Sequence, residues 1–344
     1  MKNAKRNKLG SYAALAALCG ILLPLPGAAT DDWSQCAGKT DDGERLKCYD
    51  TLNAARLPTA ATSPGAAKRS YLTRSWDLDN RDDDLLGDDQ SPLRPHRTSY
   101  LIARKTGEPN LLPESPSRAA PAAPADIEAT ELKFQFSQKA KILNSRSTHF
   151  LGITSFRLWG AYTQQSSWQA FNADKSSPFR ETNYEPELIA TFGTGNEYGL
   201  KLINLGWAHQ SNGRDATASR SWNRVYLQGG WETDTLSALV RGWWRIPEDA
   251  AHDDNPDIED YIGRAEITLR WAPLDNSQVI DLTLRNNLRS EQNHSFMQLD
   301  WATPITLNQS AKLHVQFTSG YGESLIDYNY RQTTFGFGVS FRDW

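Results

Sequence analysis

Long apolar runs are missing from most of the sequence. After the first 30 of the 344 residues there is no stretch of about 20 apolar residues, which argues against an internal transmembrane helix. The formal net charge of −4 is small, so the charge balance gives no sign of a nucleic-acid partner. The length suits one large domain with an extension, and the fold class has to come from the residue pattern.

Cysteine is also scarce, with three residues in the whole chain. Cys19 lies in an N-terminal segment in which basic residues precede a short apolar core and the small residues Gly27-Ala28-Ala29. This pattern predicts a signal peptide over residues 1–29. Export leaves Cys36 and Cys48, and an even pair in an oxidising compartment suggests a disulfide, with two free thiols as the alternative.

Aromatic residues are few in the segments that follow the signal peptide. Residues 50–128 are rich in Pro, Ala, Asp and Ser, and we expect a mostly irregular periplasmic extension over residues 30–95. A second stretch, residues 112–128, contains SRAAPAAPAD and resembles a linker-like insertion. The main domain is expected to span residues 96–344, with a first strand at residues 99–106.

Alternating apolar and polar residues dominate the chain from residue 131 onward. In ITLRWAP, for example, Ile267, Leu269 and Trp271 alternate with Thr268 and Arg270. Such a period of two indicates strands, about 11 of them after residue 130 and about 12 with residues 99–106.

Two properties favour strands that cross a membrane over those of a soluble sandwich. The strands are about 10 residues long, which suits a tilted crossing, and their polar positions carry charges of both signs, as in a barrel interior. Aromatic residues near strand ends resemble a girdle at each interface: Trp231, Trp243, Trp244, Tyr261, Trp271, Trp301 and Tyr321. The predicted fold is all-β, a transmembrane antiparallel β-barrel of about 12 strands in the outer membrane of a Gram-negative bacterium.

Two reactive side chains interrupt one of the apolar rows. Ile203, Leu205 and Trp207 share a strand face, and His209 and Ser211 continue the same row. If this strand and the next pair symmetrically about their connection, His209 faces Asn223. Ser211, His209 and Asn223 then meet on the lipid-facing surface.

A serine becomes a useful nucleophile when a base takes its proton and a third group orients that base. Ser211, His209 and Asn223 could fill these three roles, although a neutral amide stabilises an imidazolium less than a carboxylate does. The alternative is an ordinary polar belt at the membrane interface. The residue pattern alone leaves both interpretations open.

Four stretches give the sequence a resemblance to outer membrane phospholipase A: SSPFRETNYEP, HQSNGR with SRSWNR, DDNPDI, and SGYGESLIDYN. The resemblance is strong over residues 160–330. It implies hydrolysis of acyl ester bonds of phospholipids (sn-1 and sn-2) and of lysophospholipids. The activity implied is that of a phospholipase A1/A2 with a serine nucleophile. The resemblance further implies that this activity depends on Ca²⁺ and on a homodimer in the membrane.

The resemblance also implies roles for individual residues. Ser211 matches the nucleophile, His209 the base, Asn223 the group that orients it, and Gly213 an oxyanion-hole N–H donor. Four other positions match calcium-site residues: Ser176 from the partner subunit, Arg214 and Ser219 through backbone carbonyls, and Asp254. Gln164 matches a residue that hydrogen-bonds across the dimer interface. Ala216 stands where some relatives have an aspartate of a calcium site in the monomer, so the monomeric site is in question.

Other classes of function remain as alternatives. A non-enzymatic barrel, either a small pore or a structural protein, would also alternate, but about 12 strands crowded with charged residues leave little lumen. An adhesin or receptor would need long outer loops, and most connections look short.

Overall fold

The computed structural model describes residues 34–56, 70–79, 93–145, 152–196, 198–273, 277–305 and 308–341. The predicted signal peptide lies outside these residues. The chain divides into two compact units, residues 1–68 and residues 69–344. Helices in the described residues are short, and none is long and apolar enough to cross a membrane.

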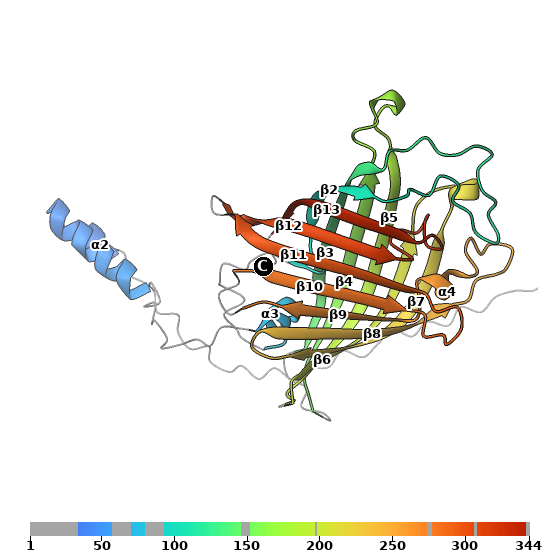
Figure 1. Ribbon diagram of the computed structural model, residues 1–344. Helices are drawn as coiled ribbons and strands as arrows, with labels where there is room; N and C mark the ends of the chain where they lie inside the picture. Colours follow the sequence, from blue (N-terminus) through green and yellow to red (C-terminus); the bar gives the residue numbers. More distant parts are fainter. Residues whose placement is uncertain are drawn as a thin grey trace, which may run out of the picture. The chain divides into compact units, whose positions relative to one another are not determined.

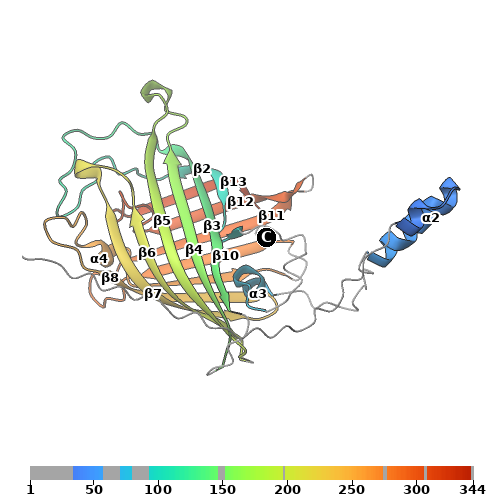
Figure 2. The ribbon, with the colours of Figure 1, turned by 180° about the vertical axis from the view of Figure 1, so that it is seen from behind.

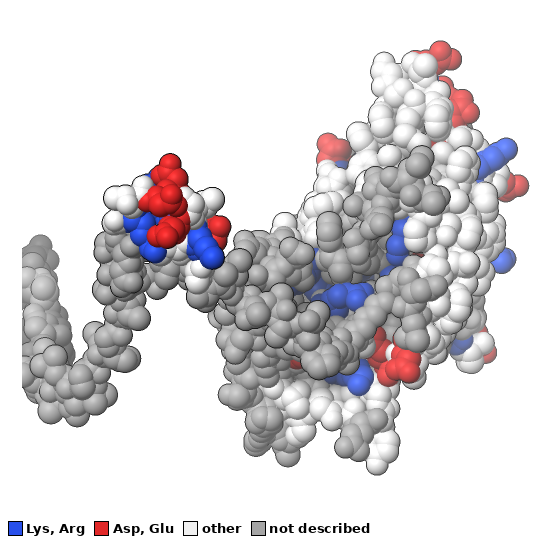
Figure 3. All heavy atoms as spheres, turned by 90° about the vertical axis from the view of Figure 1, so that its left-hand side faces the viewer, with Lys and Arg blue, Asp and Glu red and all other residues white. Residues whose placement is uncertain are grey.

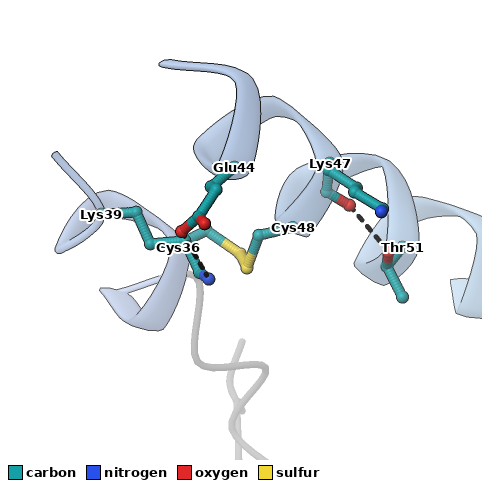
Figure 4. The surroundings of a disulfide bond; sticks show 6 residues. All are labelled: Cys36, Lys39, Glu44, Lys47, Cys48 and Thr51. Atoms are coloured by element: carbon teal, nitrogen blue, oxygen red, sulfur yellow. Dashed lines mark hydrogen bonds and ion pairs between the residues drawn. A yellow bond between two sulfur atoms is a disulfide. The ribbon is translucent and has the colours of Figure 1, made fainter. Parts of the chain in front are cut away.

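The described part of the first unit is helical, which differs from the irregular extension expected. Helices α1 (Ser34–Ala37) and α2 (Asp42–Arg56) are joined by a disulfide between Cys36 and Cys48, as the cysteine count suggested (Figure 4). Asp41 caps α2, since its Oδ1 atom accepts a hydrogen bond of 2.9 Å from the Glu44 N–H. The low aromatic content of this segment therefore excludes a large hydrophobic core. It does not exclude two short helices that are held together by a disulfide.

The second unit is a β-barrel (Figures 1 and 2). Its strands are β1 (Leu93–Pro95), β2 (Tyr100–Thr106), β3 (Thr130–Ser145), β4 (Ile153–Trp168), β5 (Phe179–Thr194), β6 (Leu200–Ser211), β7 (Ser221–Glu232), β8 (Leu236–Ile246), β9 (Ala265–Trp271), β10 (Val279–Asn286), β11 (Ser295–Ile305), β12 (Asn308–Gly320) and β13 (Gln332–Phe341). Short helices are α3 (Tyr71–Trp76), α4 (Ile258–Tyr261), and the 3₁₀ turns η2 (Ala173–Lys175) and η3 (Ala216–Ala218).

Strands β2 to β13 form the closed ring. Each pairs antiparallel with the next along the chain, and β2 also pairs with β13. The sheet has 13 strands, but β1 only extends the edge of β3 beyond β2, so 12 strands make the barrel. The prediction of about 12 strands is confirmed, and the strand expected at residues 99–106 is β2.

The two faces of the strands are inverted relative to a soluble protein. Large apolar side chains point outward and are exposed, such as Leu205 (55%), Leu227 (49%) and Phe337 (60%). Charged side chains point into the lumen and are almost fully buried, such as Lys133 (0%) and Glu131 (2%). This arrangement stabilises a barrel whose outside contacts hydrocarbon.

Opposite charges pair inside the lumen, as the sequence indicated. The Glu185 carboxylate accepts hydrogen bonds from Arg224 at 2.5 Å and from Arg97 at 2.8 Å. A second cluster joins Arg104 to Glu131 and Glu323. These pairs satisfy charges that would be costly to bury alone, and a cavity of about 230 Å³ remains between them.

Helix α3 occupies one end of the lumen, so the barrel unit begins before the boundary expected at residue 96. Trp76 is 3% exposed and packs edge-on against Trp159, with ring centres 6.4 Å apart. Lys139 Nζ lies 3.5 Å from the centre of the Trp76 ring. The Leu72 N–H donates to Glu232 at 2.9 Å, which fixes the helix to β7. Figure 3 shows Lys and Arg side chains within this mouth of the barrel.

Of the expected girdle aromatics, Trp243 lies inside the barrel and two tyrosines lie in loops. Trp243 is 5% exposed and donates a hydrogen bond of 2.8 Å to the Gly263 carbonyl. Tyr261 and Tyr321 pack against each other in the loops, with ring centres 5.4 Å apart. Trp231, Trp244 and Trp271 do face outward at strand ends. An aromatic residue near a strand end therefore does not by itself reveal which face it occupies.

The two ends of the barrel differ in their connections. Helices α3 and α4 lie at opposite ends of the strands (Figures 1 and 2). The α4 end carries long connections, including residues 107–129 and 247–264, whereas a turn at the other end spans only residues 233–235. The expectation of mostly short loops is therefore wrong for the α4 end. Short periplasmic turns and long external loops are typical of outer-membrane barrels.

The insertion at residues 112–128 lacks strands and helices, as expected, but it packs against other loops. Its single bridge joins Ser115 to Arg118. The Ser115 hydroxyl donates a hydrogen bond of 2.6 Å to the Asp254 carbonyl. Asn172 donates to the Asp126 carbonyl at 3.1 Å. The segment is therefore a loop at the α4 end that makes specific contacts with neighbouring loops.

We expect Trp76→Ala to lower the free energy of unfolding by about 3 kcal/mol, because it removes a large buried ring that packs against Trp159 and Lys139. Urea titration of the folded protein in detergent, followed by the mobility shift between folded and unfolded barrel, measures this change. The control is Tyr198→Ala, whose ring is 93% exposed. Equal unfolding midpoints for the two variants would contradict the packing role of α3.

Candidate active site

Strands β6 and β7 bring the predicted site residues together. Their register pairs His209 with Asn223, Trp207 with Val225 and Leu205 with Leu227, as the symmetric pairing predicted. Side chains two residues apart point to the same face, so His209 and Ser211 continue the outward row of Leu205 and Trp207. The three polar residues therefore lie at the α4 end of the outer face.

The imidazole and the amide are in direct contact. His209 Nδ1 lies 2.9 Å from Asn223 Oδ1, and since the amide oxygen only accepts, Nδ1–H is the donor. The Asn223 amide nitrogen donates in turn to Glu248 Oε1 at 3.1 Å. His209, Asn223 and Ser211 are all half-buried. Nε2 is thereby left as the basic nitrogen of the ring.

The Ser211 hydroxyl has no hydrogen-bond partner within the described part of the chain. Catalytic hydrogen bonds are often long without substrate and tighten in the complex. Ser211 pairs with Ser221 on β7 and with Tyr184 on β5, and Tyr184 pairs with Gln164 on β4. Gln164 thus lies two strands from Ser211 in the same cross-strand row, about 10 Å away.

Asn212 shapes the loop that follows the serine, a role that the sequence analysis missed. Its Oδ1 atom accepts hydrogen bonds from the N–H groups of Arg214 at 3.3 Å and Arg220 at 3.0 Å. Its amide nitrogen donates to the Ala218 carbonyl at 2.8 Å. The Ser-Asn-Gly order was the available signal, because asparagine before glycine commonly closes a turn on its own backbone.

Gly213 comes next and adopts a left-handed conformation with φ of 62°. A Cβ atom here would lie 3.0 Å from the Tyr184 ring, so both the backbone angle and the space favour glycine. Among the described residues no group accepts a hydrogen bond from the Gly213 N–H. A backbone N–H that is free beside a candidate nucleophile is suited to stabilise an oxyanion.

The residues matched to a calcium site lie in loops at the same end. Ser176 is exposed at the end of η2 with φ of 60°, in the β4–β5 connection. The Arg214 side chain folds back to donate to the carbonyls of Phe179 and Arg180. Its own carbonyl accepts no hydrogen bond from any described residue. The Ser219 carbonyl accepts one bond of 2.7 Å, from Arg220, which leaves a second lone pair.

Asp254 is beside this group, and its carboxylate is already engaged. One oxygen pairs with Arg118, and the other accepts a hydrogen bond of 2.5 Å from the Ser219 hydroxyl. No group of three or more His, Cys, Asp and Glu side chains suited to a metal ion occurs among the described residues. The oxygen donors here are mainly carbonyls and hydroxyls, which suit a hard cation such as Ca²⁺.

The 247–264 loop that carries Asp254 is tied to the β12–β13 loop. Tyr328 donates a hydrogen bond to Asp257 Oδ1. Burial raises the pKa of the Asp257 carboxyl, and the hydrogen bond from Tyr328 partly offsets that rise. The loops behind the candidate site therefore brace one another.

Comparison with known proteins supports this geometry. The family model described as "Phospholipase A1" matches residues 72–341. A putative phospholipase A1 of Neisseria meningitidis serogroup B is 32% identical over 94% of each chain. Phospholipase A1 of Escherichia coli K12 is 36% identical over 74% of this chain and 83% of that protein.

The fold also matches that of a solved outer membrane phospholipase. The Salmonella typhi outer membrane phospholipase, crystallised as a dimer with bound calcium, superposes with a TM-score of 0.63 and 31% identity. The match covers 76% of this chain and 96% of the other. A non-enzymatic pore or structural barrel is thereby set aside. This chain belongs to the phospholipase A1 family and is an outer-membrane phospholipase of a Gram-negative bacterium.

Proposed function

We propose that the protein hydrolyses the acyl ester bonds of phospholipids, at sn-1 and sn-2, and of lysophospholipids through Ser211, His209 and Asn223. The observation that carries this proposal is the 2.9 Å contact between His209 Nδ1 and Asn223 Oδ1 on the same outward face as Ser211. Leu205 and Val225 are exposed on the same outer face, so acyl chains that pack there would bring the ester region close to these polar groups. The substrate therefore needs no passage through the barrel.

The reaction follows from the roles of the three side chains. His209 Nε2 takes the hydroxyl proton as Ser211 Oγ attacks the ester carbonyl carbon, and the carbonyl oxygen becomes an oxyanion. The N–H of Gly213 donates to that oxyanion. When the ester C–O bond breaks, the leaving alcohol takes the proton from the imidazolium and the acyl group stays on Ser211. Water then repeats the two steps, which releases the fatty acid and restores the serine.

Calcium dependence and activation by dimerisation are part of the same proposal. The carbonyls of Arg214 and Ser219 fit as ligands because each has a lone pair to offer, and Ser176 would come from the partner subunit. Asp254 would hold the Ser219 hydroxyl, while its other carboxylate oxygen is paired with Arg118. When bound, the cation would supply positive charge beside the developing oxyanion.

The outer face is suited to a weak homodimer in lipid. Its large apolar residues gain little by meeting each other, because lipid tails are equally apolar. Gln164 is among the polar groups on this face, and its side chain contacts Tyr162 and Ser166 on its own strand. In a dimer its amide could hydrogen-bond to the partner as well. An equilibrium that needs calcium and substrate would keep the enzyme idle in an intact membrane.

We expect Ser211→Ala to fold normally and to lose activity by several orders of magnitude, because no other hydroxyl replaces the nucleophile. Release of fatty acid from phospholipid in mixed detergent micelles measures the loss. Retention of more than about a tenth of the wild-type rate would rule out Ser211 as the nucleophile.

Asn212→Ala should lower kcat by about a hundredfold, because the loop no longer holds the Gly213 N–H toward the oxyanion. KM should change little, since Asn212 is only 4% exposed and lies behind the lipid-facing surface. Thr217→Val, in the same loop, is the control and should stay close to wild type. If the two variants have equal kcat, the Asn212 contacts do not serve catalysis.

Calcium together with a substrate analogue should shift the protein from monomer to dimer in analytical ultracentrifugation. Ser176→Ala should weaken both this shift and the activity, whereas Ser290→Ala, an exposed serine in another loop at the same end, should weaken neither. A fully active monomer at saturating calcium would refute the coupling and leave the Ser211 chemistry standing.

A further inference from the structure

The carboxylate of Glu248 contacts the proposed triad on the far side of Asn223 from His209. Asn223 pairs with Ile246 at the end of β8, and two residues later Glu248 turns back toward the same asparagine. The Asn223 amide nitrogen donates to Glu248 Oε1 at 3.1 Å. The chain of contacts from His209 therefore continues through Asn223 to an acid on the loop of residues 247–264.

We propose that Glu248 is a positioning residue that sets the orientation of Asn223 and, through it, the tautomer of His209. This inference rests on the proposed function of the triad. Without a fixed partner, an asparagine amide can present either its oxygen or its nitrogen to a histidine. The side chain of Asn223 alone would not decide which ring nitrogen of His209 is basic.

The hydrogen-bonding capacities of the three groups remove that choice. An ionised carboxylate accepts hydrogen bonds and cannot donate them, so Glu248 requires the NH₂ side of the amide. The Asn223 oxygen must then face His209, where it accepts from Nδ1–H at 2.9 Å. The lone pair is left on Nε2, which is the nitrogen that takes the proton from Ser211.

Glu248 also compensates for the missing charge of a Ser-His-Asn triad. A neutral amide stabilises an imidazolium less than the aspartate of other serine hydrolases does. A carboxylate one amide further away polarises the hydrogen bonds in the same direction. The acid of a conventional triad is thus present in this site, but it acts through Asn223 rather than on His209 directly.

The other acids of this loop have different partners. Asp249 accepts from the Ala251 N–H at 2.9 Å, and Asp253 binds Arg245 at 2.7 Å. Asp254 is held by Arg118 and Ser219. Within the described residues, Glu248 has no Lys or Arg partner. Its charge is therefore not neutralised locally, which suits an electrostatic role.

The test compares kcat and KM of Glu248→Ala, Glu248→Gln, Asn223→Ala and the double variant Asn223→Ala/Glu248→Ala, on phospholipid micelles with calcium. Glu248→Ala should lower kcat by about 10- to 100-fold, the loss typical when the hydrogen-bond partner that orients a metal-ligating side chain is removed. KM should be unchanged, because Glu248 acts on Asn223 and not on the substrate. Glu248→Gln, which keeps an acceptor oxygen without the charge, should fall between Glu248→Ala and the wild type.

The most specific expectation concerns the kcat of the double variant. Once Asn223 is absent, Glu248 has nothing to orient, so the double variant should be no slower than Asn223→Ala alone. Asp249→Asn is the matched control, because it removes one negative charge from the neighbouring residue and keeps an oxygen for the Ala251 N–H; it should stay within about twofold of wild type.

Three results would overturn the inference: wild-type kcat in Glu248→Ala, effects that multiply in the double variant, or an equal loss in Asp249→Asn. If Glu248→Ala fails to fold, the same cycle run with Glu248→Gln decides the question. Ser211→Ala separates this inference from the function on which it rests. An inactive Ser211→Ala beside a fully active Glu248→Ala would refute the role of Glu248 alone.

Discussion

The requirement that backbone polar groups in hydrocarbon be paired within the protein governs the whole structure. Only a helix or a closed barrel meets it across a membrane, and here β2 pairs with β13 to close the ring. Closure gives every strand one face toward lipid and one toward the lumen. A reactive group can therefore reach a membrane substrate simply by occupying an outward position near a strand end, as Ser211 does on β6.

The same requirement explains why the inside of the barrel is the ordered core. Charges that would be expelled from the outer face are paired across the lumen, as between Arg224 and Glu185. Helix α3 adds an apolar layer at one mouth, where Trp76 packs against Trp159. This rigid interior holds β6 and β7 in register. The contact between His209 and Asn223 is thus an outcome of strand pairing rather than of a flexible loop.

Strand periodicity and turn symmetry made a large part of this architecture predictable. Because side chains alternate strictly, the face of His209 followed from Leu205 and Trp207, and symmetric pairing placed it opposite Asn223. The features that sequence reasoning missed depend on longer-range packing. His96, for example, is buried against Glu187 at 2.7 Å, and Trp243 turns inward to bond the Gly263 carbonyl. The two helices joined by the Cys36–Cys48 disulfide were not predicted, because this segment is mostly polar.

Glu248 and Asn212 were missed for a different reason. Both act through hydrogen bonds made by loops, and a loop path is not fixed by an alternating pattern. The β7–β8 register places Ile246 beside Asn223, but nothing in that pattern indicates that the chain then returns Glu248 to the same amide. The strand-borne part of the site was therefore predictable, and the loop-borne part required the structure.

The central claim is that a serine on the lipid-facing wall of the barrel is the nucleophile. The most direct measurement is mass spectrometry of the active protein after reaction with an organophosphorus probe for serine hydrolases. The account predicts a single covalent adduct on the peptide that contains Ser211, formed in step with loss of activity and absent when His209 is replaced by alanine. Complete inhibition with the adduct on any other residue, or unchanged labelling without His209, would contradict it.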